Sequence, residues 1–145
     1  MDDGSIKRRY ESLVSLADGG AVACGSIWEG TSPAQAKGIL SRWDAKGNLV
    51  FEMIITMGKL NEIVQTQGGF AATCFIQDDL GAQIKWKLLE FDEKGILCGG
   101  HDLYVNGSST AVGLIARAAD GELVCAQAVG EYGYEDVIVS VIKAK

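Results

Sequence analysis

The residues best suited to acid–base chemistry are few and far apart. His101 is the only histidine in the chain, and a nucleophile needs such a base within hydrogen-bond reach. Its neighbour Asp102 would lie on the opposite face if this segment is a strand, because side chains alternate along a strand. Asp78 and Asp79 are adjacent aspartates in the middle of the chain, and paired carboxylates could act as acid and base on a glycoside. Solvated loops are the commoner setting for such residues, so the sequence predicts no catalytic residue.

The sequence also predicts no metal and no cofactor. The turns "DAKG" at 44–47 and "DEKG" at 92–95 carry a lysine where a calcium loop needs a further oxygen ligand. Gly99 and Gly100 lack the lysine and the helix that a phosphate loop requires. The four cysteines are Cys24, Cys74, Cys98 and Cys125. They stand inside short apolar runs with no C-x-x-C spacing, which is typical of free thiols with a structural role.

Composition limits the classes of partner. A chain of 145 residues with 48% hydrophobic and 22% charged residues fits one folded domain. Its net charge is −6, and its only basic cluster, residues 7–9, is short and close to two acids, so nucleic acid is not an expected partner. No apolar run approaches the eighteen or so residues that span a bilayer, and the first residues do not resemble a secretory signal. Free cysteines favour a cytoplasmic location.

Glycine-containing turns divide the chain into short apolar segments. The turn signals are "DGG" at 18–20, "DAKG" at 44–47, "QGG" at 67–69, "DEKG" at 92–95 and "DG" at 120–121. Glycine accepts the positive φ of tight hairpins, and Asp bonds back to nearby backbone. Several of the segments alternate, with Leu114, Ala116 and Ala118 on one side of a strand and Ile115 and Arg117 on the other. Period two indicates half-buried strands, and only residues 32–37 suggest a short turn of helix.

The hairpins repeat as a unit of four strands, about 50 residues long. "ESLVSLADGGAVACGSI" matches "NEIVQTQGGFAATCFI", and "GILSRWDAKGNLVFEM" matches "KLLEFDEKGILCGGH". The predicted units cover residues 10–60, 61–108 and 109–145 of a single all-β domain. A four-stranded unit of this length is typical of β-propeller blades.

The stretches "YESLVSLADGGAVACGS", "GILSRWDAKGNLVFE" and "NEIVQTQGGF" resemble the DGG-type β-propeller repeats of bacterial proteins. In those repeats an Asp-Gly-Gly turn joins the first two strands and Asp-x-x-Gly-Asn joins the last two. The chain departs from the pattern where Gln67 replaces the turn Asp and Glu122 the second glycine, and where only Phe51 supplies the aromatic residue after the second turn. The resemblance implies three four-stranded antiparallel blades and a role in recognition.

Three blades do not close a ring, since propellers have four to eight. One solution is a homodimer with six blades, in which the segment 4–10 adds a fourth strand to the partner's last blade, beside "DVIVSVIKAK". The alternative is a β-trefoil, which contains three four-stranded repeats and closes on itself as a monomer.

The longer connections between strands should gather at the end opposite the tight turns, where loops on a rigid scaffold often carry function. Aromatic rings beside acids and amides suit a carbohydrate or peptide ligand. The expected ligand-binding residues are Trp28, Glu29, Asp78, Asp79, His101, Asp102, Tyr104, Tyr132 and Tyr134, with Gln77, Asn106 and Glu131 nearby. The leading hypothesis is a non-catalytic ligand- or protein-binding module. A carbohydrate-active enzyme using Asp78, Asp79 or Glu131, and a purely structural oligomer, are the alternatives.

Overall fold

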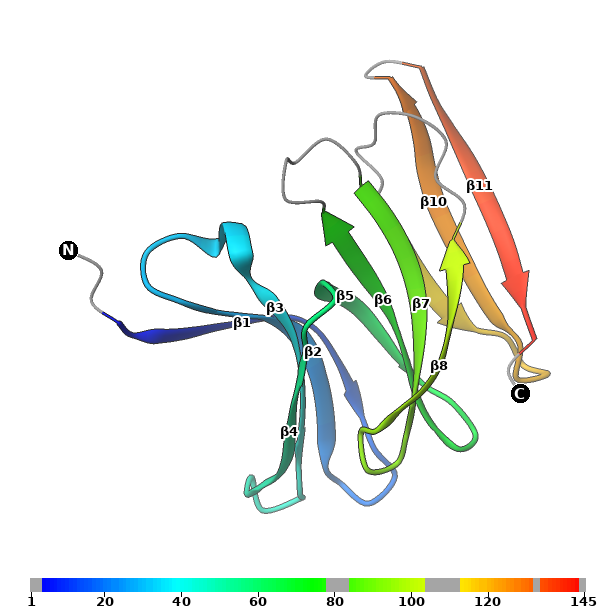
Figure 1. The fold of residues 1–145 in the computed structure, drawn as a ribbon. Helices are drawn as coiled ribbons and strands as arrows, with labels where there is room; N and C mark the ends of the chain where they lie inside the picture. The colour runs from blue at the N-terminus through cyan, green and yellow to red at the C-terminus, as the bar shows by residue number, and fades with distance from the viewer. Residues whose placement is uncertain (1–3, 78–83, 104–112, 132–133, 144–145) are drawn as a thin grey trace.

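The computed structural model describes residues 4–77, 84–103, 113–131 and 134–143, which form three antiparallel β-sheets and a single turn of 3₁₀ helix (Figure 1). The predicted all-β class is therefore confirmed. The sheets contain four, four and three strands and stay separate. Within the described residues they do not join into a closed barrel, as the strands of a self-closed β-trefoil would.

In each sheet, neighbouring strands follow one another in the sequence. The first sheet comprises β1 (Ile6–Ser15), β2 (Ala21–Glu29), β3 (Lys37–Trp43) and β4 (Leu49–Ile55). The second comprises β5 (Lys59–Gln65), β6 (Gly69–Gln77), β7 (Ile84–Asp92) and β8 (Leu97–Leu103). The third comprises β9 (Gly113–Arg117), β10 (Leu123–Glu131) and β11 (Tyr134–Ile142). Each sheet is thus formed by one continuous stretch of the chain.

The β3–β4 and β7–β8 turns owe their shape to an aspartate and a glycine. In the β3–β4 turn, the Asp44 carboxylate accepts a 2.8 Å hydrogen bond from the backbone N–H of Asn48, while Gly47 has a φ of 82°. The β7–β8 turn repeats this arrangement with Asp92 and with Gly95, whose φ is 80°. A type I turn followed by a left-handed glycine is a common hairpin connection, and glycine adopts that φ without steric cost.

The second sheet is the middle layer of the molecule, with apolar side chains packed on both of its faces. Phe70 and Ala72 of β6 belong to a core shared with the first sheet, which includes Val22 and Leu40. Ala71, between them, belongs to a second core shared with the third sheet. Two-sided burial follows from the near-continuous apolar run of β6, because alternate side chains must then enter different cores.

The two outer faces of this three-layer stack have no partner among the described residues. Leu13 on β1 is 64% exposed, and Val139 on β11 is 60% exposed. Other large apolar residues on these two faces are also exposed: Ile6, Tyr10, Ile54, Leu114, Val137 and Val141. Soluble monomers rarely show apolar patches of this kind without a function for them.

The N-terminal segment takes a position different from the predicted one. Residues 6–10 form the first half of β1 and pair with residues 25–29 of β2 in the same chain. The prediction has them add a fourth strand to another copy's third sheet. Since these residues already pair within their own sheet, the structure gives no support to strand exchange. The third sheet has three strands among the described residues.

Candidate functional site

A groove that contains two of the predicted ligand-binding residues lies beside the connection between β2 and β3. It encloses about 560 Å³. The residues lining it come from β1, β2, the connection, β3 and β4, and they include Ile6, Ile27, Trp28, Glu29, Ser32, Lys37 and Ile54. Two residues predicted from the sequence, Trp28 and Glu29, are thus brought together, with lysine and isoleucine side chains that were not predicted.

The connection that borders this groove is held in a defined shape. Gly30 has a φ of 78° and its N–H donates a 3.1 Å hydrogen bond to the carbonyl oxygen of Ser5. The 3₁₀ turn η1 (Pro33–Gln35) follows, and the hydroxyl of Ser32 accepts a 3.3 Å hydrogen bond from the N–H of Ala34. Proline at the first position of such a turn needs no hydrogen-bond donor. The predicted short helical turn at 32–37 is therefore present as η1.

His101 and Asp102 are adjacent on β8 but face different sheets. His101 Nε2 lies 3.4 Å from a carboxylate oxygen of Glu90, on the face toward the third sheet. Asp102 forms an ion pair with Lys87 on the opposite face. The Lys87 ammonium lowers the pKa of Asp102 below its usual range, with a smaller effect from Lys85. The alternation predicted for this pair is correct, and the two side chains do not form one site.

A second cleft, of about 630 Å³, opens between the second and third sheets at the end where the tight turns lie. Glu90 and His101 line it together with Asp120, Glu122 and Lys143. The sequence pattern predicts only a structural role for the turn residues, so this cleft was not anticipated. No signal in the sequence identifies it, because it depends on how far apart two sheets stand.

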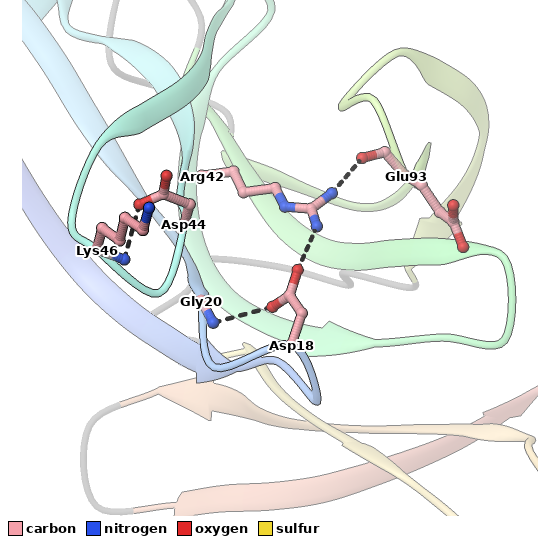
Figure 2. Close-up of polar contacts among 6 residues, drawn as sticks. All are labelled: Asp18, Gly20, Arg42, Asp44, Lys46 and Glu93. Atoms are coloured by element: carbon pink, nitrogen blue, oxygen red, sulfur yellow. Dashed lines mark hydrogen bonds and ion pairs between the residues drawn. The ribbon is translucent and has the colours of Figure 1, made fainter.

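Arg42 occupies the corresponding region between the first and second sheets (Figure 2). One guanidinium nitrogen donates a 2.9 Å hydrogen bond to the Asp18 carboxylate, and another donates a 3.2 Å bond to the carbonyl oxygen of Glu93. The backbone N–H of Gly20 donates to the other oxygen of Asp18 at 2.9 Å. Hydrogen bonds from Gly20 and then Arg42 lower the pKa of Asp18. A glutamate, Glu90, stands at the equivalent place in the second sheet.

The cysteines divide into two environments. Cys24, Cys74 and Cys125 are buried, while Cys98 is exposed, and all four are free thiols. Burial raises the pKa of the Cys74 thiol to about 12 and also raises the pKa of Cys24 and Cys125. Three of the four thus have the predicted setting of small buried hydrophobic residues. Cys98 does not, because it lies on the outer strand β8.

Several predicted residues cannot be assigned to either groove. Asp78, Asp79, Tyr104 and Tyr132 lie outside the described residues. So does Asn106. Tyr134 begins β11, where only its backbone is described, and Glu131 likewise ends β10.

Neither the family models nor the curated proteins include a match to this chain. Among the described side chains, no three of His, Cys, Asp and Glu gather closely enough to hold a metal ion. None of the helical structure in the described part of the chain is long and apolar enough to cross a membrane.

Proposed function

We propose that this chain is a binding module made of three propeller-like blades, and that it recognises a peptide segment of a partner protein through the groove beside η1. Each sheet is an antiparallel meander in sequence order, as the resemblance to DGG-type repeats implies. The first strands of consecutive sheets are also neighbours, since β5 contacts both β1 and β9. First strands that lie side by side are consistent with blades arranged around a central axis.

The lining of the groove carries the proposal for the ligand. Ile6, Ile27 and Ile54 come from three different strands and form an aliphatic floor. Glu29 and Lys37 add one charge of each sign at its border. Binding sites commonly combine an apolar surface with a few polar groups that fix orientation. Trp28 also lines the groove, but it alternates with Ile27 along β2 and so does not belong to the same face as the three isoleucines. An aliphatic floor fits an apolar peptide side chain better than a sugar, which stacks on aromatic rings.

The test is a measured peptide affinity with matched variants. Peptides would be selected from a displayed random library on the immobilised protein, and their binding measured by fluorescence anisotropy. We expect Lys37→Glu and Ile54→Asp to weaken binding about tenfold or more, equivalent to about 1.4 kcal/mol. Lys46→Glu makes the same charge change in an exposed turn at the other end of the sheet and should leave the affinity unchanged.

Two results would contradict the proposal. One is a set of selected peptides whose binding is unaffected by Lys37→Glu and Ile54→Asp. The other is a glycan array in which sugars bind the groove and the same two variants abolish that binding, which would support the carbohydrate alternative.

A further inference from the structure

We infer that a second copy of this chain covers both outer faces of the stack, so that two chains form a closed ring of six sheets. In this arrangement the third sheet of each copy packs on the first sheet of the other. The inference rests on the propeller-like architecture proposed above, and it names the surfaces and residues of the contact. It does not depend on the identity of the peptide ligand.

Strand register shows that residues of the outer faces have buried equivalents inside the stack. Leu13 pairs with Ala23, the third residue after the second glycine of its turn. Ile63 pairs with Ala72, which holds the same place after Gly69. Ile63 is 5% exposed and packs in the core between the first two sheets, whereas Leu13 is 64% exposed. The two residues hold the same place in their sheets, and the one that a preceding sheet covers is the buried one.

The same comparison holds on the opposite face of each sheet. Leu40 pairs with Cys24, Leu88 with Thr73 and Val139 with Ala126. Each partner is the fourth residue after its turn, so these three third-strand residues are equivalent. Leu40 and Leu88 are fully buried, but Val139 is 60% exposed. A sheet that followed the third sheet would bury Val139 in the same way.

The two existing contacts between sheets specify the missing one. Leu40 of the first sheet and Ile63 of the second share one core cluster. Leu88 of the second sheet and Ile115 of the third, which is equivalent to Ile63, share the other. Continuing this relation places Val139 of one copy against Leu13 of the second copy. The outer face of the third sheet corresponds to one side of the contacts between the first and second sheets and between the second and third sheets, and the outer face of the first sheet corresponds to the other side. The two outer faces should therefore be complementary.

The number of copies follows from the number of sheets. Propellers have four to eight blades, and the described residues of each copy form three sheets. Two copies give six, whereas three copies give nine. The contact joins unlike faces, and a contact of this type must close into a ring to avoid open filaments.

Polar side chains on the outer face of the first sheet do not oppose this burial. Arg8 and Glu52 form an ion pair with each other at 2.9 Å, and the Tyr10 hydroxyl lies 3.0 Å from that of Ser41. Paired polar groups can be covered at far lower cost than unpaired ones. The peptide groove shares this face but lies at its other end, since Ile6 pairs with Glu29 while Leu13 pairs with Ala23. The inferred contact is therefore centred on the half of the face nearest the tight turns and leaves the groove open.

Solution mass by light scattering at about 100 µM tests the inference. The chain has a mass of 15.4 kDa, so the ring has twice that mass, about 31 kDa. We expect Leu13→Glu and Val139→Lys each to give a monomer of 15.4 kDa. Leu97→Lys adds a charge at an exposed apolar residue of β8, away from both faces, and should remain dimeric. Far-UV circular dichroism reports whether each variant folds. If Leu13→Glu or Val139→Lys does not fold, the milder variants Leu13→Gln and Val139→Thr are used in their place.

Mixing the two variants gives the decisive result. One contact of the mixed ring joins two unmodified faces, and the other brings the lysine introduced by Val139→Lys against the glutamate introduced by Leu13→Glu. The mixture should therefore return to about 31 kDa, twice 15.4 kDa. A monomeric unmodified protein, a mixture that stays monomeric, or a dimer disrupted by only one of the two variants would overturn the inference. The Lys37→Glu peptide assay is read separately, so failure of the ring and failure of the groove are distinguishable.

Discussion

Arg42 reaches from the third strand of one sheet to the Asp18 carboxylate, 2.9 Å away, in the turn between the first two strands of the same sheet. The same guanidinium also bonds the backbone of Glu93 in the next sheet. A planar guanidinium with several N–H donors can hold two acceptors at once, which an ammonium group does less well. This residue therefore ties two tight turns and two sheets together at one end of the molecule.

Replacing Arg42 should loosen this connection. We expect Arg42→Met to lower the free energy of unfolding by about 1 kcal/mol. A buried hydrogen bond between charged groups would contribute more, but the Arg42–Asp18 pair is partly exposed to solvent. Urea unfolding at one fixed protein concentration measures the change. Arg9→Met removes the more exposed Arg9–Glu11 pair and should change stability by less than about 0.5 kcal/mol. Equal effects of the two variants would contradict the role given to Arg42.

Stability should fall in acid through the turn aspartates. Hydrogen bonds from Asn48 lower the pKa of Asp44 below its ordinary value of 3.8, and the pKa of Asp18 is lowered as well. A lowered native pKa means that the unfolded chain binds protons more readily. The stabilisation is therefore complete above the ordinary pKa and is lost as the pH falls through the native value.

Carboxyl titration by NMR measures these values directly. Asn48→Ala should raise the pKa of Asp44 toward 3.8 and leave that of Asp18 unchanged. If Asp44 titrates at or above 3.8 in the unmodified protein, the hydrogen bonds assigned to the turn are wrong.

Two glycines should respond very differently to alanine. A Cβ at Gly25 would lie 1.9 Å from the carbonyl oxygen of Arg9 on the neighbouring strand, whereas Gly47 has nothing within 4 Å and a φ of 82°. Gly47→Ala should cost about 1 kcal/mol, because alanine is strained at a positive φ. Gly25→Ala should cost more than about 3 kcal/mol, since the backbone of β1 must move. Thermal unfolding of both variants provides the comparison, and the reverse order would count against the observed strand spacing.

One thiol should react rapidly in the folded protein. Cys98 is exposed, while burial raises the pKa of Cys74 to about 12 and that of Cys24 and Cys125 above the ordinary value. Thiolates are the reactive form. At pH 8, Ellman's reagent should label one cysteine quickly and the others only on unfolding. Cys98→Ser should remove the fast phase, and a fast phase that persists would place a second reactive thiol at the surface.

The strands and turns could be predicted from the sequence because they depend on neighbouring residues. Asp44 and Gly47 stand three residues apart, and their side chain and backbone preferences suffice to fix the turn. The alternation of Leu114 and Ile115 likewise gives one exposed and one buried residue. Which strand a segment pairs with depends on residues that are distant in the sequence. Period two fits residues 6–10 into either sheet, so the sequence did not determine that they pair with β2.

The candidate site was predictable only in part. Trp28 and Glu29 were identified because the connection that follows them is long, but Lys37 and Ile54 enter the same groove through the register of β3 and β4. Register across three strands is a tertiary property, and spacing along the chain does not reveal it. The cleft that contains Glu90 and His101 was missed for the same reason.

Burial of the second sheet on both faces has a consequence for the order in which the molecule opens. Amide hydrogens exchange with solvent only when their strand separates from its neighbours, and the slowest ones mark the last region to open. In a single copy those amides should belong to β6 and β7, where Ala71 and Ala72 enter different cores. The outermost sheets would exchange earlier, and joining two copies would remove that difference.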